Sequence, residues 1–540
     1  MIRWFAMKLQ LSCLEDRSVW DGAQIRLPAF DIAEVRKKSF AEPAWIHFGA
    51  GNIFRAFPAM LQQELLNQGI AATGIIVAEG YDYQIIDDLF IRHDNLSLLV
   101  TLKADGTLEK TVIASMTEAL KADRNHQDFN RLKEIFRKKS LQMASFTITE
   151  KGYSLVNGEG RYLPDVEADF TRGPEASESY MGKVAALLYE RFIAGRCPLA
   201  MVSMDNCSHN GDKLFQAVHA FAEAWSRAGL TDPDFTRYIE NPDTVSFPWS
   251  MIDKITPRPD EGVRALLEKD GFEGAAGLVT EKNTYIAPFV NAEEAQYLVI
   301  EDLFPNGRPP LDKAGVIFTN RDTVNNVEKM KVCTCLNPLH TALAVFGCLL
   351  GYTKISDEMK DDDLKLLVER LGYDEGLPVV VNPGIIDPRA FIEEVLTIRF
   401  PNSFMPDTPQ RIATDTSQKL AIRFGETIKA YLKEGRDINF LKAIPLVQAG
   451  WLRYLLGFDD AGEAFTLSPD PLYDSLKEHI SGIRLGDQGP FPSLRPVLSD
   501  ERIFGIDLYQ AGLAGRVEEL FTEMLSGKGA VRQTIRKQIA

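Results

Sequence analysis

One stretch near the amino terminus restricts the fold of this chain more than any other, because two buried strands flank a glycine turn and a helix. Residues 44–48 form an apolar strand pattern, and Gly49-Ala50-Gly51 follow it directly. Helical spacing runs over residues 52–66, and a second apolar strand pattern over residues 75–78 ends at Glu79. This order is typical of the first βαβ unit of a doubly wound parallel sheet.

The same stretch predicts a dinucleotide site. Gly49 permits a tight turn, and Gly51 lets the backbone approach a pyrophosphate at the start of the helix. Glu79 can accept hydrogen bonds from a ribose diol and would repel a 2′-phosphate, which favours NAD over NADP. Two features depart from the usual fingerprint. Phe54 occupies the third glycine position, and Glu79 lies further along the chain than the roughly 20 residues expected. The residues predicted to bind the cofactor here are Gly49, Gly51, Asn52, Ile53, Phe54 and Glu79. The alternative is a βα turn that binds nothing.

Composition excludes several classes of partner. The 540 residues carry a net charge of −16, which disfavours nucleic acid and anionic membrane surfaces. The six cysteines show neither a disulfide framework nor zinc-ribbon pairs, so we expect a reducing, cytoplasmic location. The amino terminus lacks the features of a signal peptide, and no apolar run approaches the ~20 residues that span a bilayer.

The pattern changes near Asn306-Gly307-Arg308-Pro309-Pro310, which is the best boundary signal in the chain. Before it, strand and helix patterns alternate; after it, helical spacing dominates. We therefore predict an α/β protein with a Rossmann-type domain over residues 1–310, beginning with an arm of little periodicity over residues 1–43. A mostly α-helical domain is expected over residues 311–540, with a last stretch, residues 527–540, that frays.

Polar residues follow two further strand patterns. Thr149 and Glu150 end the pattern that begins at residue 145, and Asp205-Asn206 follow the pattern over residues 199–203. Ligands of open α/β sheets bind at the carboxyl ends of strands, so Thr149 and Glu150 are candidates for cofactor binding. An Asp-Asn pair is more often a helix cap, but the Asn206 amide could also steady an alkoxide.

A third cluster lies in Lys331–His340, immediately before the apolar run of residues 341–350. A lysine near apolar surroundings can act as a base, the Asn337 amide can donate to a developing alkoxide, and His340 can orient a hydroxyl. The structural alternative is a snorkelling lysine, a helix end and a satisfied core histidine.

These motifs together resemble the polyol-specific long-chain dehydrogenase/reductase family, which includes mannitol 2-dehydrogenase, fructuronate reductase and tagaturonate reductase. The resemblance runs from about Trp45 to the C-terminal region. It rests on residues 47–56 (HFGAGNIFRA), 147–153 (TITEKGY), 203–206 (SMDN), 251–257 (MIDKITP), 328–331 (EKMK), Asn337, His340 and 399–402 (RFPN).

The resemblance implies a Rossmann domain, a helical domain, a site between them and no catalytic metal. It implies that Lys331 is the general base and that Asn206 and Asn337 hold the reacting oxygen. Asp253, His340 and Arg399 would bind the substrate's hydroxyl or carboxylate groups. Hydride would pass between the substrate carbinol carbon and the nicotinamide of NAD.

One spacing departs from the family pattern, because Lys331 stands one residue further from Asn337 and His340 than is usual. At about 100° per residue, a regular helix would direct Lys331 and His340 to opposite sides. A π-bulge would absorb the extra residue, and we favour this solution. The alternative is that Lys329 is the base.

Among substrates we favour a hexuronate, D-fructuronate reduced to D-mannonate, with tagaturonate/altronate and fructose/mannitol as competitors. A carboxylate needs a cation, and the candidates are Arg399, Arg411, Lys254 and Lys419. A zinc site built from Cys207, Cys333, Cys335 and nearby histidines is a weaker reading, because a C-x-C in a helix points its sulfurs apart. A non-catalytic sugar-acid binder is the alternative to an enzyme, and we expect a monomer or small homo-oligomer.

Overall fold

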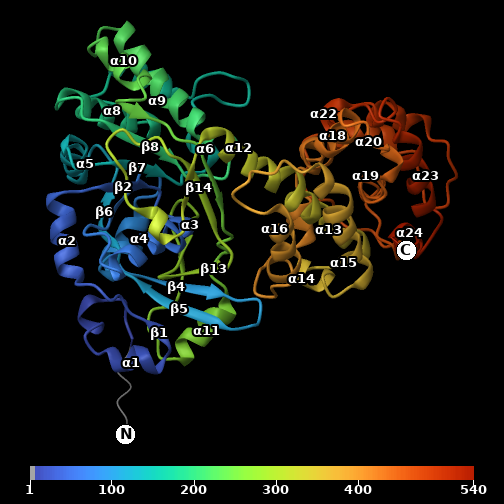
Figure 1. Cartoon of the computed structure of the whole chain (residues 1–540), viewed down its shortest axis with the longest axis horizontal. Coiled ribbons are helices and arrows are strands. Elements are labelled where there is room, and N and C mark those ends of the chain that lie inside the picture. The colour runs from blue at the N-terminus through green and yellow to red at the C-terminus, as the bar shows by residue number, and fades with distance from the viewer. Residues whose placement is uncertain (1–6, 540) are drawn as a thin grey trace. The chain divides into compact units, whose positions relative to one another are not determined.

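The computed structural model describes residues 7–539, and the chain divides into two compact units. The first comprises the chain up to Asn325 apart from Ala104–Gly106; the second comprises those residues and the chain from Asn326 onward. The division falls inside helix α12 (Arg321–Met330), later than the Pro-Gly segment around Asn306. Figure 1 shows the first unit in blue to yellow-green and the second in yellow to red.

Six parallel strands form the central sheet of the first unit, in the order β6-β3-β2-β7-β8-β9. In chain order this is the 3-2-1-4-5-6 arrangement of a Rossmann sheet. The strands are β2 (Trp45–Phe48), β3 (Ile75–Glu79), β6 (Met116–Lys121), β7 (Met143–Phe146), β8 (Leu199–Ser203) and β9 (Val245–Ser246). The predicted Rossmann-type fold is confirmed.

Both faces of this sheet are covered, which explains why its strands are apolar throughout. Helices α5 (Asp128–Arg137), α8 (Tyr180–Ile193) and α9 (Asn210–Arg227) pack on one face, against side chains such as Ile46 and Ile76. Helices α3 (Asn52–Ala56) and α4 (Pro58–Asn67) pack on the other, against alternate residues such as Trp45 and Val77. The strand period of two therefore divides each strand between two cores.

Besides the two-stranded pair of β11 (Leu278–Val279) and β12 (Tyr285–Ile286), two smaller sheets extend the first unit. One contains β1 (Ile25–Arg26), β5 (Leu108–Ile113), β4 (Ser97–Leu102) and β13 (Phe289–Glu293). The other contains β10 (Ser250–Asp253), β14 (Tyr297–Glu301) and β15 (Ile317–Thr319). The second sheet places Asp253 at the end of a strand, opposite Tyr297.

The described residues 7–43, predicted as an arm of little periodicity, contain short regular elements. They form α1 (Arg17–Gly22), β1 and α2 (Ile32–Ala41), and β1 pairs in parallel with β5. Trp20 and Val35 are buried. These elements are too short to show a period in sequence, and tertiary packing stabilises them. Residues 1–6 of the predicted arm lie outside the described part of the chain.

The second unit is helical around α13 (Asn337–Leu350), which confirms the prediction of a mostly helical domain. Helix α13 packs against α19 (Ala443–Tyr454), and α19 packs against α23 (Ala514–Met524). The predicted fraying after residue 527 is wrong, because α24 (Ala530–Ile539) buries Val531 and Ile535 on one face. Ala540 lies outside the described residues.

The longest helical stretch of the described residues runs from Arg321 to Leu350 and is the one stretch there that is long and apolar enough to cross a membrane. Within its most apolar window, 78% is buried inside the protein, as is common for a core helix. Length and composition alone are weak evidence for a membrane span.

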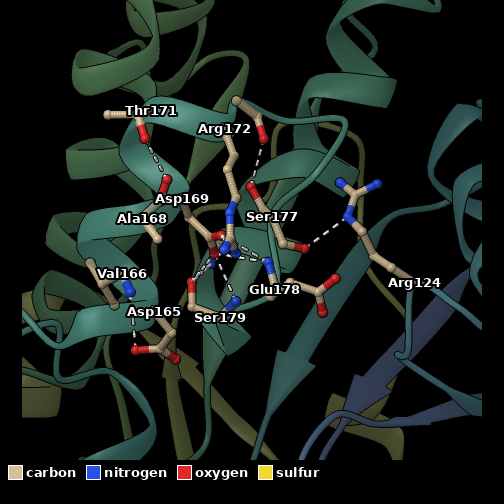
Figure 2. Close-up of polar contacts among 12 residues, drawn as sticks. Arg124, Asp165, Val166, Ala168, Asp169, Thr171, Arg172, Ser177, Glu178 and Ser179 are labelled. Atoms are coloured by element: carbon tan, nitrogen blue, oxygen red, sulfur yellow. Dashed lines mark hydrogen bonds and ion pairs between the residues drawn. The ribbon is translucent and has the colours of Figure 1, made fainter.

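A buried carboxylate fixes the start of α8 (Figure 2). Asp169, at the end of α7 (Pro164–Arg172), accepts hydrogen bonds from the Glu178 and Ser179 N–H groups and from the Ser179 hydroxyl, at 2.7–3.0 Å. Tyr180 follows, and its ring packs so closely on Gly80 that a Cβ there would lie 2.5 Å from it. The turn after β3 is thereby held in place.

An aromatic stack replaces the third glycine of the fingerprint. Phe54 is fully buried, and its ring stacks on His47 at 4.3 Å between centroids. The two ring nitrogens of His47 lie 2.7 Å from Ser145 Oγ and 2.8 Å from Thr147 Oγ1. Burial lowers the pKa of His47 to about 3, so the ring is neutral at pH 7. The stacked rings of Phe54 and His47 fill the space between α3 and the sheet, where a glycine would allow closer packing.

We predict that His47→Gln destabilises the protein more at pH 7.5 than at pH 5. At pH 7.5 the loss of the stack and its hydrogen bonds should cost about 1–3 kcal/mol. Between pH 6.5 and 3 the unfolded wild type takes up a proton that folded His47 does not, so wild-type stability falls as pH falls. The difference between wild type and variant should therefore shrink by about 2 kcal/mol at pH 5 in urea denaturation. Phe54→Leu, which removes the stacked ring but keeps His47, is the control and should retain the wild-type pH dependence.

Candidate functional site

The glycine turn after β2 combines one crowded and one open position. Gly49 has φ +106°, and a Cβ there would lie 2.2 Å from the Thr147 carbonyl oxygen. At Gly51 a Cβ would meet nothing within 4 Å. In the described chain, neither Gly51 nor Asn52 donates its backbone N–H to a protein acceptor. Unpaired N–H groups beside open space are a fitting cradle for phosphate oxygens, so the turn fits a dinucleotide.

Glu79 supports this turn directly. Its carboxylate accepts hydrogen bonds from Ala50 N–H at 3.0 Å, Tyr81 N–H at 2.8 Å and Asp82 N–H at 3.2 Å. One oxygen therefore takes two bonds and the other takes one, which leaves acceptor capacity for a ribose hydroxyl. Glu79 therefore stabilises the turn and is also a candidate to bind the cofactor ribose.

The carboxyl ends of β7 and β8 are joined by Asp205. Its carboxylate accepts the N–H groups of Ile148 and Thr149, each at 2.9 Å, and the Tyr153 hydroxyl at 2.5 Å. Burial nevertheless raises the pKa of Asp205 above its usual value. These bonds hold Thr149 at φ +64°, a strained conformation for a β-branched residue. Glu150 is exposed and pairs with Lys213 at 2.5 Å.

Asn210, which sequence reasoning left without a role, orders the neighbouring loop. Its Nδ2 donates to the carbonyl oxygens of Asp205 at 3.0 Å and Ser250 at 2.9 Å, and its Oδ1 accepts the Ser250 N–H. The segment carrying exposed Asn206 is thus tied to β10, whose last residue is buried Asp253. The signal was its place after a strand exit, which ordinary helix capping would also explain.

In the second unit, the extra residue before Asn337 is absorbed by a π-helical turn, Lys331–Cys335. The Leu336 N–H donates to the Lys331 carbonyl at 3.1 Å, and the His340 N–H to the Leu336 carbonyl at 3.0 Å. The predicted π-bulge is confirmed. Lys331 is buried at 4% exposure, whereas Lys329 is exposed.

His340 lies in a shell of charges. Its Nε2 is 3.6 Å from Asp407 Oδ2, too far for a hydrogen bond, and its ring centroid is 5.0 Å from that of Phe400. Burial lowers the pKa of His340 to about 4 despite Asp407, and Arg423, Arg411 and Arg399 lower it further. His340 is therefore a neutral imidazole whose Nε2 has no protein hydrogen-bond partner in the described chain.

Asn337 opens α13 beside this histidine. The Thr341 hydroxyl donates to the Asn337 carbonyl at 2.8 Å. In residues 7–539 the Asn337 side-chain amide forms no hydrogen bond with the protein, so its donor is available to a ligand. Arg399 is buried at the end of a second π-helical turn, Val395–Arg399.

Within the described residues, no group of three or more His, Cys, Asp or Glu side chains is placed to hold a metal ion. Burial raises the pKa of Cys333 to about 11, so this thiol is protonated at pH 7. The cysteines of the C-x-C segment behave as small core residues.

Two family descriptions match the chain: the mannitol dehydrogenase Rossmann domain over residues 43–313 and the mannitol dehydrogenase C-terminal domain over residues 323–525. The D-mannonate oxidoreductase of Thermotoga maritima is 54% identical over 99% of both chains. The polyol:NADP oxidoreductase of Gluconobacter oxydans is 29% identical over 85% of this chain and 88% of its own.

A solved structure also resembles the whole chain. The mannitol 2-dehydrogenase of Pseudomonas fluorescens, in a ternary complex with NAD and D-mannitol, has a TM-score of 0.70 and 26% identity. The likeness covers 98% of this chain and 99% of that one.

We predict that His340 stays neutral down to about pH 4. Histidine-selective ¹³C NMR, with the resonance assigned by its loss in His340→Gln, should show no titration near pH 6.5. Asp407→Asn should lower the midpoint further, because it removes the one carboxylate that favours the charged ring. A midpoint near 6.5 would contradict the buried, cation-surrounded site.

Proposed function

The chain belongs to the mannitol dehydrogenase family, and from this membership we propose that it is an NAD-dependent oxidoreductase that interconverts D-fructuronate and D-mannonate. The observation that carries the proposal is the 54% identity, over nearly the full length of both chains, to a D-mannonate oxidoreductase. No step of the proposal needs a metal ion.

The first unit supplies the cofactor site. The glycine turn at Gly49 and Gly51, with the N–H groups of Gly51 and Asn52, would hold the pyrophosphate. Glu79 would accept a hydroxyl of the adenine ribose, and its charge disfavours a 2′-phosphate. Ile53, Thr149 and Glu150 complete the proposed set through their place after β2 and β7. Phe54 contributes by filling the core beneath the turn. When bound, NAD supplies the acceptor for the carbinol hydride.

The second unit supplies the proton chemistry. Lys331 is the proposed base: it takes the hydroxyl proton during oxidation and returns it during reduction. The Asn337 amide donates to the same oxygen as negative charge grows on it, and Asn206 is the proposed second amide. Neutral His340 binds a substrate hydroxyl through its unpartnered Nε2. Asp253 and Arg399 are proposed to bind other polar groups of the substrate.

Three alternatives to this proposed function start from the same fold. Tagaturonate/altronate or fructose/mannitol would replace the substrate, and a non-catalytic sugar-acid binder would keep the fold alone. A panel of keto-uronates and ketoses, assayed by NADH oxidation, tests all of these. The fructuronate proposal requires the highest kcat/KM with that substrate, and no turnover across the panel would favour the binder.

We predict that Lys331→Ala lowers kcat/KM for D-mannonate oxidation by about 10²- to 10⁴-fold, because general base catalysis is lost. The rise of the rate with pH, which reports deprotonation of the base, should disappear as well. Lys329→Ala is the matched control, and it should keep both rate and profile because Lys329 is exposed. An active Lys331→Ala with an unchanged profile would transfer the role to Lys329.

We predict that Gly51→Ala weakens NADH binding roughly tenfold, or about 1.4 kcal/mol, without changing the melting temperature. A methyl group has room in the folded chain but occupies the space a pyrophosphate needs. Fluorescence titration with NADH measures the effect. Gly515→Ala, where a Cβ also meets nothing within 4 Å, is the control. Unchanged affinity in Gly51→Ala would remove the turn from the cofactor site.

A further inference from the structure

An arginine without an acidic partner lies beside the helix that carries the proposed base. Arg423 stands in the middle of a π-helical turn, Ala421–Gly425, and its side chain is partly buried. Its guanidinium donates to the Thr341 hydroxyl. In the described chain no carboxylate forms an ion pair with it. Burial lowers the pKa of Arg423 to about 10, with no acid to offset this. A partly buried guanidinium without a paired carboxylate is stabilised when it binds an anionic ligand.

A second cation adds to the same charge. Lys419 lies four residues earlier, and the Arg423 N–H donates to the Lys419 carbonyl at 3.0 Å, so both side chains share one helical face. The Lys419 ammonium donates to the Thr414 carbonyl and, in residues 7–539, forms no ion pair with a carboxylate. Burial and then the Arg423 charge lower the pKa of Lys419. Like charges at this spacing repel, and an anion between them would relieve the repulsion.

The pair also lies close to the proposed proton-transfer residues of the same unit. The turn that carries Arg423 packs against the π-turn of Lys331 and against α13. Thr341, which accepts from Arg423, is the residue after His340 and donates to the Asn337 carbonyl. The Arg423 charge reaches His340 and lowers the pKa of its ring.

We propose that Arg423 and Lys419 form a carboxylate-binding site that selects uronates over uncharged ketoses, with the Thr341 hydroxyl holding the Arg423 guanidinium in position. A guanidinium can bind a carboxylate through two parallel N–H donors, and the ammonium adds a second charge. An uncharged sugar would leave both cations unpaired. This inference rests on the proposed function, because it assigns the acid group of that substrate to particular residues.

Two of the other candidate cations are already engaged within the protein, and Arg399 is proposed above to bind other polar groups of the substrate. Arg411 pairs with Asp407. The Lys254 ammonium donates to the Glu293 carbonyl at 2.9 Å and to Gln296 Oε1 at 3.0 Å. Lys419 is the member of the sequence-derived set that this site retains, and Arg423 is the addition.

The test compares Arg423→Met with Arg423→Lys, and with Arg436→Met as a matched control. Arg436 is an exposed arginine of the same unit that pairs with Glu434. D-Fructuronate and D-fructose are reduced with NADH at neutral pH. Arg423→Met should raise KM for fructuronate by about 10- to 100-fold, as expected for loss of a charged hydrogen bond. Its kcat/KM for fructose should change less than about threefold, and Arg423→Lys should restore part of the loss.

A binding measurement separates this site from the chemistry. D-Mannonate should raise the melting temperature of the wild type and of Arg436→Met more than that of Arg423→Met. Equal losses on both sugars, or an unchanged KM for fructuronate, would overturn the anion site. If Arg423→Met does not fold, Lys419→Met carries the same comparison and the same two outcomes decide it. Failure of the wild type to turn over any keto-uronate would instead refute the proposed function.

Discussion

The hydrogen bond from the Leu336 N–H to the Lys331 carbonyl governs the geometry of the second unit. It closes one turn over five residues rather than four, and α13 begins directly after the bend at Leu336. In a regular helix, Lys331 and His340 would point to opposite sides, and the wider turn absorbs the extra residue between them. The turn also leaves Lys331 buried while Lys329 remains exposed. This backbone irregularity and the burial of Lys331 are the two observations that favour Lys331 over Lys329 as the proposed base.

Other π-helical turns of this unit carry arginines. Arg399 ends the π-turn Val395–Arg399, and Arg423 occupies the middle of the π-turn Ala421–Gly425. Wide turns of this kind are frequent at functional sites because they re-aim a side chain without ending a helix. In the first unit, side-chain hydrogen bonds at the ends of strands position the candidate residues. Asp205 and Asn210 fix the loops that carry Thr149 and Asn206.

Periodicity and turn chemistry predicted the parts of the fold that are long and buried. The bounds of β8 agree with the sequence pattern over residues 199–203, and β3 ends at Glu79 as expected. The elements of the arm and the last helix were missed because they are short and carry many polar residues. Packing against the rest of each unit stabilises them. The π-turn was predictable because the spacing from Lys331 to Asn337 is one residue longer than the family pattern.

Arg423 was not predictable in the same way. A single cation in a helical pattern is usually solvated, and only its place inside the apolar run Leu420–Phe424 hinted otherwise. The absence of an acidic partner is a three-dimensional property. Asn210 escaped notice for a related reason, since its hydrogen bonds join the nearby Ser203 and Asp205 to Ser250, which is distant in sequence.

Glu79 has a consequence for anyone who would redesign the coenzyme preference of this scaffold. The usual strategy exchanges the acid after the second Rossmann strand for a small or basic residue. Here that carboxylate accepts three backbone N–H groups, including one from the glycine loop itself. Removing it would orphan those donors and loosen the loop that both coenzymes need. Successful switching should therefore begin with the residues that surround this acid.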